Sequence, residues 1–178
     1  WLRAQGFPSV ALYLAEAAHV EFRDFSFEDH APQAVVVGDL GDGWTFERLN
    51  RAFRQLLGGA VLVAIQKNRY WKTGEGLSLD AGPFVAALEY AVGTEATVVG
   101  KPSAAFFEGA ARALDAPLFA VAVVGDDIAT DVAGAQTAGA RGVLVKTGKY
   151  RSGDLERSDA RPDLVIDSVA DLPAALGL

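Results

Sequence analysis

The sequence lacks several residue types, and each absence excludes a class of protein. None of the 178 residues is cysteine, which excludes disulfide-stapled folds and zinc sites built on thiolates. A chain without cysteine suits a reducing compartment, so we expect a cytoplasmic location. Methionine is also absent and the first residue is Trp1, so we expect the chain to be a fragment or a processed piece of a longer protein.

Positive charge is scarce as well, and no apolar run is long. The chain has 16 Lys and Arg against 23 Asp and Glu, a net charge of -7, which argues against nucleic acid or an anionic membrane as the main partner. No apolar run approaches the length of a membrane span, and no basic, apolar leader opens the chain. What the chain does have is 51% hydrophobic residues, enough to bury a core.

Short valine-rich runs alternate with helical patterns along most of the chain. The runs are apolar at successive positions, as expected of parallel strands covered on both faces. They are Val10–Leu14, Ala34–Val37, Ala60–Ile65, Ala96–Val99, Phe119–Val124, Gly142–Val145 and Leu164–Ile166. The helical patterns are Thr45–Leu57, Ala81–Val92, Ser103–Leu114, Ile128–Ala138 and Val169–Leu176; Gln66–Leu79 and Thr147–Asp163 have neither pattern. Strands that alternate with single helices predict an α/β fold with a mainly parallel sheet.

Three carboxylates follow one of these strands, in "VAVVGDDIATDVAGAQTAG" (Val121–Gly139). The apolar run ends in Gly125, and Asp126 and Asp127 follow it at the position where ligands of open α/β sheets bind. Asp131 lies four residues after Asp127. Asp127 could simply cap the helix, with Asp126 in solvent. Asp127 and Asp131 share a helix face, however, and like charges there repel unless a cation such as Mg²⁺ compensates.

A lysine follows the preceding strand, in "TVVGKPS" (Thr97–Ser103). Lys101 could be an ordinary solvated lysine. The two strands belong to consecutive β–α units, however, so we expect them to be neighbours in one sheet. Lys101 would then lie beside the acids, and a cation next to a carboxylate and metal cluster is the arrangement that phosphoryl chemistry demands.

At this spacing, "VVGKPS" and "VVGDDIATDVAGAQTAG" resemble motifs III and IV of the haloacid dehalogenase (HAD) superfamily of phosphatases. Within the superfamily the chain resembles members with a C2-type cap, above all the phospholysine phosphohistidine inorganic pyrophosphate phosphatase group. "QKNRYWKTGEGLSLDAGPFVAALEYAVGTEATVVGKPS" and "RGVLVKTGKY" extend the resemblance over nearly the whole chain. It implies a C2-type α/β cap domain in residues 1–95. Residues 96–178 would be the C-terminal portion of a HAD-like hydrolase core, a Rossmannoid parallel sheet.

The resemblance also implies roles at the predicted catalytic site. Asp126 would be a catalytic residue that ligates Mg²⁺, directly or through water. Asp127 and Asp131 would orient the metal site and the neighbouring backbone. Lys101 would neutralise the nucleophilic carboxylate and bind the transferring phosphoryl group of the substrate.

A substrate-binding segment is implied in the first half of the chain. The loop 67–79, with Asn68 and Arg69 at its start, matches the cap segment that lies over the active site and selects the substrate. The same loop could instead be a polar connection that contacts no ligand.

One expected motif is missing from this chain. Catalysis in the superfamily begins at Asp-x-Asp-Gly, whose first Asp attacks phosphorus to give an aspartyl phosphate and whose second acts as general acid and base. "AVVVGDLGDGWTF" (Ala34–Phe46) imitates it, but Asp39 and Asp42 are three positions apart rather than two, and the stretch matches the cap. We therefore expect the nucleophile upstream of Trp1. Without that first strand the core sheet would have an apolar edge, which a homodimer or a partner segment could mask.

The sequence therefore predicts a Mg²⁺-dependent phosphohydrolase that works through an aspartyl phosphate. Its substrates would be small phosphate monoesters, phosphoramidates or pyrophosphate. The alternative is a truncated, non-catalytic α/β domain that binds Mg²⁺ or phosphate without turnover. A receiver-type phosphoacceptor domain also combines acids, Mg²⁺ and lysine, although the chain length and the cap-like first half count against it.

Overall fold

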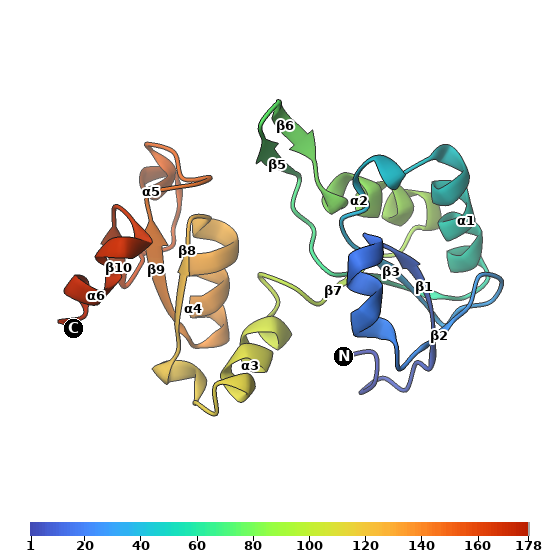
Figure 1. Ribbon diagram of the computed structural model, residues 1–178, viewed down its shortest axis with the longest axis horizontal. Coiled ribbons are helices and arrows are strands. Elements are labelled where there is room, and N and C mark those ends of the chain that lie inside the picture. Colours follow the sequence, from blue (N-terminus) through green and yellow to red (C-terminus); the bar gives the residue numbers. More distant parts are fainter. Residues whose placement is uncertain (178) are drawn as a thin grey trace. The chain divides into compact units, whose positions relative to one another are not determined.

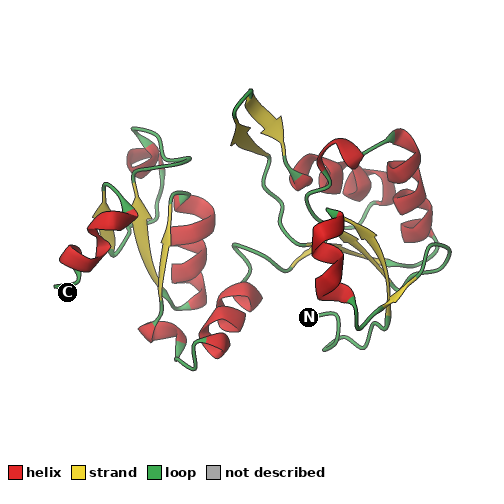
Figure 2. Ribbon diagram, viewed as in Figure 1, coloured by secondary structure: helices red, strands yellow, loops and turns green. Residues whose placement is uncertain are grey.

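The computed structural model describes residues 1–177 and divides the chain into two compact units, Trp1–Val99 and Gly100–Leu178. Each unit contains a parallel sheet with helices, so the predicted α/β class is confirmed (Figures 1 and 2). Residues 96–99, which we expected to open the second domain, belong to the first unit. The reason is pairing: Val63 and Ala64 pair with Thr97 and Val98. In the part of the chain described, no helix is long and apolar enough to cross a membrane.

The first unit is built on a five-stranded parallel sheet in the order β2-β1-β3-β4-β7. The strands are β1 (Ser9–Tyr13), β2 (Ser26–Phe27), β3 (Ala34–Val37), β4 (Val61–Ala64) and β7 (Thr97–Val98). All four residues of β3 are buried, as the continuous run "AVVV" predicts for a central parallel strand. Strand β3 has the predicted bounds. The bounds of β1, β4 and β7 differ from those of the predicted runs by one residue at each end.

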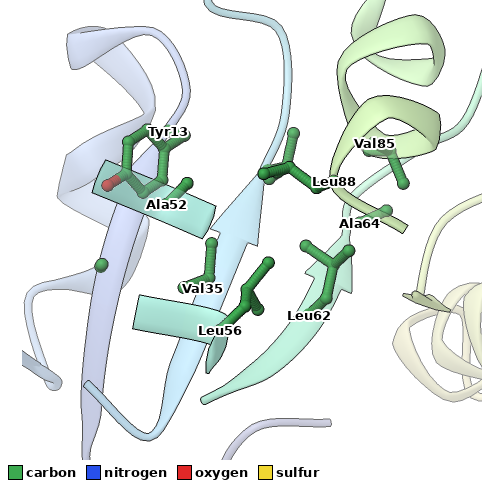
Figure 3. Close-up of a cluster of buried hydrophobic side chains, with 10 residues drawn as sticks. Tyr13, Val35, Ala52, Leu56, Leu62, Ala64, Val85 and Leu88 are labelled. Carbon is green, nitrogen blue, oxygen red and sulfur yellow. The ribbon is translucent and has the colours of Figure 1, made fainter. Parts of the chain in front are cut away.

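Two helices cover one face of this sheet. They are α1 (Phe46–Leu57) and α2 (Ala81–Val92), and shorter 3₁₀ turns lie at η1 (Glu16–Phe22) and η2 (Gly41–Gly43). Figure 3 shows side chains of both helices packed against the strands in one apolar cluster: Tyr13, Val35, Ala52, Leu56, Leu62, Ala64, Val85 and Leu88. The other face is covered by residues of the first forty, including Leu2, Phe22 and Phe25. The sheet is therefore apolar on both faces, which explains the unbroken apolar runs in the sequence.

An antiparallel hairpin lies in the segment Gln66–Leu79, where the sequence showed no pattern. Its strands are β5 (Tyr70–Thr73) and β6 (Gly76–Leu79). Seven of the eight strand residues are exposed, so no apolar alternation marks these strands in the sequence. The turn is closed by Thr73, whose Oγ1 accepts a hydrogen bond from the Glu75 amide at 3.2 Å.

Glu89 of α2 ties this helix to two loops. Its Oε1 accepts hydrogen bonds from Lys67 Nζ and from the Ala96 amide, both at 2.8 Å. Burial raises the pKa of the Glu89 carboxyl, but the Lys67 ammonium and the Ala96 amide outweigh burial and bring the pKa below its usual value of 4.5. A carboxyl whose pKa is lowered on folding stabilises the fold above its unfolded-state pKa, and this contribution is lost as the pH falls through the folded-state pKa.

We therefore expect Glu89→Gln to lower the free energy of unfolding by about 1 kcal/mol at pH 7. The difference from the wild type should shrink as the pH falls below 4.5, because the wild-type carboxyl is then protonated as well. Urea unfolding between pH 3 and pH 7 measures this. Glu95→Gln is the control, since Glu95 makes no side-chain hydrogen bond or ion pair within residues 1–177. Equal pH profiles for the two variants would contradict the prediction.

The second unit has a three-stranded parallel sheet in the order β10-β9-β8. Its strands are β8 (Ala122–Gly125), β9 (Arg141–Val145) and β10 (Leu164–Ile166). Its helices are α3 (Ala104–Ala113), α4 (Gly134–Ala138), α5 (Asp154–Arg157) and α6 (Leu172–Ala175), with short turns at η3 (Leu118–Ala120) and η5 (Val169–Asp171). Helix α4 follows directly on a π-helical segment, η4 (Ile128–Ala133), where we expected one regular helix. Helix α5 lies in Thr147–Asp163, where we expected no regular structure.

The expected pairing of the strands before Lys101 and Asp126 is wrong. Strand β7 pairs with β4 in the first unit, whereas β8 pairs with β9 in the second. Consecutive strands are often neighbours, but here the chain passes from one unit to the other at Gly100. Lys101 and the acids therefore do not follow neighbouring strands of one sheet, and another feature of the fold must bring them together.

Candidate active site

The candidate site lies where β8 ends and η4 begins. Strand β8 pairs with the central strand β9, with Val124 opposite Val143 and Gly125 opposite Leu144. The next two residues, Asp126 and Asp127, thus leave the carboxyl edge of the sheet together, as the sequence predicted. Each of the three acids in this segment has a different partner, and these partners separate their roles.

Asp131 is the buried acid of the three, and it pairs with Lys101. Its side chain is 6% exposed, against 44% for Lys101, and Oδ1 lies 2.7 Å from Lys101 Nζ. Its other oxygen, Oδ2, accepts a hydrogen bond from the Asp127 amide at 3.2 Å. The charge of Asp131 is thus compensated by Lys101. The repulsion between Asp127 and Asp131, which we expected to call for a cation such as Mg²⁺, therefore does not require one.

Asp127 caps the helical segment that begins at Ile128. Its Oδ1 accepts hydrogen bonds from the amides of Ala129 and Thr130, each at 3.0 Å. The first amides of a helical segment have no partner within it, and an Asp at this position supplies one. This is the capping role that the sequence left open for Asp127.

Asp126 has one carboxylate oxygen engaged and one available. Its Oδ2 accepts a hydrogen bond from the Lys149 amide at 2.6 Å. Its Oδ1 accepts no hydrogen bond from the residues that the structure describes. Mg²⁺ commonly binds through one or two protein carboxylates and keeps several waters, so Asp126 fits as a single ligand. No group of three or more acids and histidines that could hold a metal occurs within residues 1–177.

Lys101 reaches Asp131 because the segment that follows it packs closely on α4. A Cβ at Gly134 of α4 would lie 2.7 Å from Pro102 Cβ and 3.2 Å from the ring of Phe107, so only glycine admits this approach. The peptide bond between Lys101 and Pro102 is cis. The packing of Pro102 on Gly134 thus places Lys101, three residues before α3, next to the segment that carries the acids.

Two of the three predicted substrate-binding residues, Asn68 and Arg69, lie in the other unit. The backbone oxygens of Asn68 and Arg69 accept hydrogen bonds from the amides of Gly82 (2.9 Å) and Asp80 (3.3 Å). These bonds anchor the base of the hairpin to the start of α2. Asn68 and Arg69 thus lie on a fixed backbone in Trp1–Val99, whereas Lys101 and the three acids belong to Gly100–Leu178.

Asp39 and Asp42, the imitation of the nucleophile motif, also lie in the first unit. Asp39 is exposed after β3 and its Oδ1 accepts a hydrogen bond from the Gly41 amide at 3.0 Å, while Asp42 is in the 3₁₀ turn η2. Both line a hollow together with hairpin residues such as Trp71 and Glu75. Neither acid makes a hydrogen bond to a basic side chain within the described residues.

Two glycines support the site, although neither was given a role from the sequence. A Cβ at Gly125 would overlap the Asp131 carboxyl group, and a Cβ at Gly148 would overlap Asp126 Oδ2. Gly125 stands in the quoted "VVGDD" and Gly148 in "KTGKY". The role of Gly125 could have been inferred from its place beside the acids, because a glycine in a strand often marks a position where another group approaches the backbone closely. The second glycine is far from them in sequence, and only the sheet brings it near.

We expect Gly125→Ala to destabilise the second unit by about 1–3 kcal/mol, because the added methyl group must displace Asp131. Gly109→Ala is the matched control, since Gly109 lies within α3 and its Cβ would meet only Arg112 Nη2, at 3.8 Å. That change should stabilise the protein by about 0.5–1 kcal/mol through helix propensity. Thermal and urea unfolding measure both. A neutral Gly125→Ala variant would show that Asp131 is not held against the strand.

Comparisons with known proteins agree with one another. A family model described as HAD-hydrolase-like matches residues 98–172. The chain is 46% identical to haloacid dehalogenase-like hydrolase domain-containing protein 2 of Bos taurus over 157 residues, which is 88% of this chain and 60% of that protein. It is 42% identical to the phospholysine phosphohistidine inorganic pyrophosphate phosphatase of Rattus norvegicus over 162 residues, 90% of this chain and 59% of that protein.

Solved structures show the same likeness. The p-nitrophenyl phosphatase from Archaeoglobus fulgidus matches with a TM-score of 0.88 at 30% identity, over 98% of this chain and 69% of that one. The chain spans about 60% of the length of the curated relatives it matches.

Proposed function

Because the chain belongs to the HAD-like hydrolase family, we propose that the full-length protein is a Mg²⁺-dependent phosphohydrolase. The observation that carries the proposal is the arrangement after β8, where Asp126 has a free carboxylate oxygen and Lys101 is fixed by the buried Asp131. In this proposal Trp1–Val99 is the C2-type cap and Gly100–Leu178 is the C-terminal portion of the hydrolase core. The match of the family model to residues 98–172 supports the second assignment.

Lys101 would bind the transferring phosphoryl group. An ammonium has three N–H donors, and Asp131 accepts one of them at 2.7 Å. With 44% of its side chain exposed, Lys101 can direct the remaining donors at a phosphoryl oxygen. Asp131 would thus be a positioning residue that fixes the direction of the ammonium before substrate binds, which lowers the cost of orienting it in the transition state.

Asp126 would hold the cation through Oδ1. Bound Mg²⁺ would supply positive charge next to the phosphoryl oxygens. Asp127 would contact neither the cation nor the substrate, because its carboxylate caps the helical segment. The cap would fix the backbone between β8 and η4 and so the position of Asp126. The three acids would then divide into one ligand and two residues that position other groups.

The nucleophile would be an aspartate outside residues 1–178. The chain contains no Asp-x-Asp-Gly, and the relatives are longer than the stretch matched here. Attack by that aspartate on phosphorus would give an aspartyl phosphate and release the substrate's leaving group, after which water would regenerate the carboxylate. Lys101 and the cation held by Asp126 would stabilise negative charge on the phosphoryl group in both steps. Neither residue would attack phosphorus.

The substrate would be a small phosphorylated compound: a phosphate monoester, a phosphoramidate or pyrophosphate. The names of the rat relative and of the solved p-nitrophenyl phosphatase support this range. Asn68 and Arg69, on their anchored loop, would bind and select the substrate. A cytoplasmic location and a homodimer remain predictions.

Phosphate release from p-nitrophenyl phosphate and pyrophosphate tests the proposal. We expect Mg²⁺-dependent turnover by the full-length protein, and none by residues 1–178 alone, because the chain lacks the group that attacks phosphorus. Turnover by the 178-residue chain that is lost on Asp39→Asn or Asp42→Asn would refute this and make the "GDLGDG" stretch the nucleophile. A full-length protein that binds Mg²⁺ but shows no turnover would favour the alternative, a non-catalytic domain.

A further inference from the structure

A second segment reaches the candidate site from the neighbouring strand. Strands β8 and β9 run parallel, with Gly125 opposite Leu144, so Asp126 leaves the sheet beside the end of β9 at Val145. The turn that follows β9, residues 147–149, therefore lies at the same edge of the sheet as Asp126. Neither composition nor local pattern marks this turn as part of a site.

The turn contacts Asp126 through its backbone. The Lys149 amide donates a hydrogen bond to Asp126 Oδ2 at 2.6 Å, a short distance typical of a bond to a charged acceptor. Gly148 has a φ of +61°, a backbone conformation that residues other than glycine rarely adopt. A Cβ there would overlap Oδ2 of Asp126. Two separate constraints, backbone conformation and space, thus require glycine beside this carboxylate.

Where the turn begins, at the end of β9, it is held by contacts with β10 and the residue that follows it. Immediately before it, the Lys146 amide donates to the Ile166 oxygen of β10 at 3.0 Å, and Lys146 Nζ lies 2.9 Å from Asp167 Oδ1. The hydrogen bond from Lys146 to Asp167 raises the pKa of the lysine. Since β9 is the central strand of its sheet, the start of the turn cannot move without disturbing two strand pairings.

The turn is also fixed where it runs on to α5. The Arg151 amide donates to Asp154 Oδ2 at 2.8 Å, and Arg157 Nη2 donates to Asp154 Oδ1 at 2.7 Å. The Arg151 amide, followed by Arg157, holds the pKa of the Asp154 carboxyl below its usual value. The backbone on both sides of the turn is thus held by hydrogen bonds, to Ile166 of β10 before it and to the Asp154 carboxylate after it.

We propose that the turn 147–149 positions Asp126 for the cation: the Lys149 amide holds Oδ2 and leaves Oδ1 directed at the ion. This inference rests on the proposed role of Asp126 as the Mg²⁺ ligand. A carboxylate with one oxygen fixed by a backbone donor binds through the other without first losing rotational freedom. Partners that orient a metal ligand in this way commonly contribute 10- to 100-fold, as an order of magnitude, to metal affinity.

The first test is Mg²⁺ binding to the full-length protein, measured by calorimetry without substrate. Gly148→Ala should weaken Mg²⁺ binding about 10- to 100-fold, because the methyl group displaces the Asp126 carboxylate. The matched control is Gly139→Ala: Gly139 has a φ of +96°, and a Cβ there would meet no atom within 4 Å. It imposes backbone strain in the same unit without touching Asp126, and its Mg²⁺ affinity should stay within about twofold of the wild type. Equal losses in both variants would overturn the proposal.

The second test needs no glycine variant. In ¹H–¹⁵N spectra of the full-length protein, the Lys149 amide signal should shift as Mg²⁺ is added, and Asp126→Asn should abolish that shift. A Lys149 amide that Mg²⁺ leaves unchanged in the wild type would overturn the inference. Because neither readout uses turnover, both results can hold in a protein without phosphatase activity. In that case the proposed function fails and this inference stands.

Discussion

Asp126→Asn should lower kcat/KM of the full-length protein by on the order of 100- to 1,000-fold, the usual effect of removing one preorganised electrostatic group. An amide keeps the size of the side chain and can still accept the Lys149 N–H, so the turn that packs on it should stay in place. What the variant loses is the negative charge that would bind Mg²⁺. Turnover at increasing Mg²⁺ concentration, with thermal unfolding in parallel, measures the result.

The adjacent acid is the control for this prediction. Asp127 differs from Asp126 by one position, but its carboxylate accepts two helix amides, and Asn is as good a cap as Asp. Asp127→Asn should therefore change kcat/KM by less than about threefold and stability by less than about 0.5 kcal/mol. If Asp126→Asn retains most of the activity with an unchanged Mg²⁺ requirement, Asp126 is only a solvated strand-end residue. If the two variants are equally inactive, the separation of roles among the acids is wrong.

Lys101→Met should have the second large effect, on activity and on stability together. It leaves Asp131, 6% exposed, as a buried carboxylate without its cation. Breaking a fully buried pair costs about 3–5 kcal/mol, but Lys101 is 44% exposed and water screens the pair, so we expect about 1–3 kcal/mol. The loss of the ammonium should also lower kcat/KM on the order of 100- to 1,000-fold.

A double-mutant cycle with Asp131→Asn separates the two effects. Once Asp131 is neutral, Lys101→Met no longer leaves a buried charge, so the double variant should be more stable than the sum of the single losses predicts, by about 1–2 kcal/mol. The same cycle on Lys146 and Asp167 is the control, because that pair is largely exposed and should show much weaker coupling. Additive losses at Lys101 and Asp131 would mean that the 2.7 Å ion pair contributes nothing in solution.

The strands illustrate what can be predicted from sequence and what cannot. Strands β3 and β9 were found because each is covered on both faces, which requires apolar residues at successive positions. Hairpin β5–β6 was missed because its residues are exposed, so burial imposes no pattern on them. Helix α2 was predicted with its observed bounds, and both ends have local causes: Asp80 caps the start, and Gly93 ends it at a φ of 73°.

The candidate site divides in the same way. That three acids leave the end of β8 was determined by the sequence alone, because strand and helix patterns are local and the acids are consecutive or one turn apart. That Asp131 is paired with Lys101, thirty residues away, was decided by the packing of Pro102 on Gly134. The sequence suggested a shared sheet edge for these residues, and β7 instead lies in the other unit.

By itself the sequence determined the α/β class, most of the buried strands and the acids at the end of β8, since each depends on residues close together in the chain. Only the tertiary structure decided the distant partners, Lys101 for Asp131 and the Lys149 amide for Asp126, whereas the cap that Asp127 makes is a local contact that the sequence already offered. Hydrogen bonds and ion pairs act over about 3 Å. Residues 23 to 30 positions apart come within that distance only when the sheet and helices that carry them have packed.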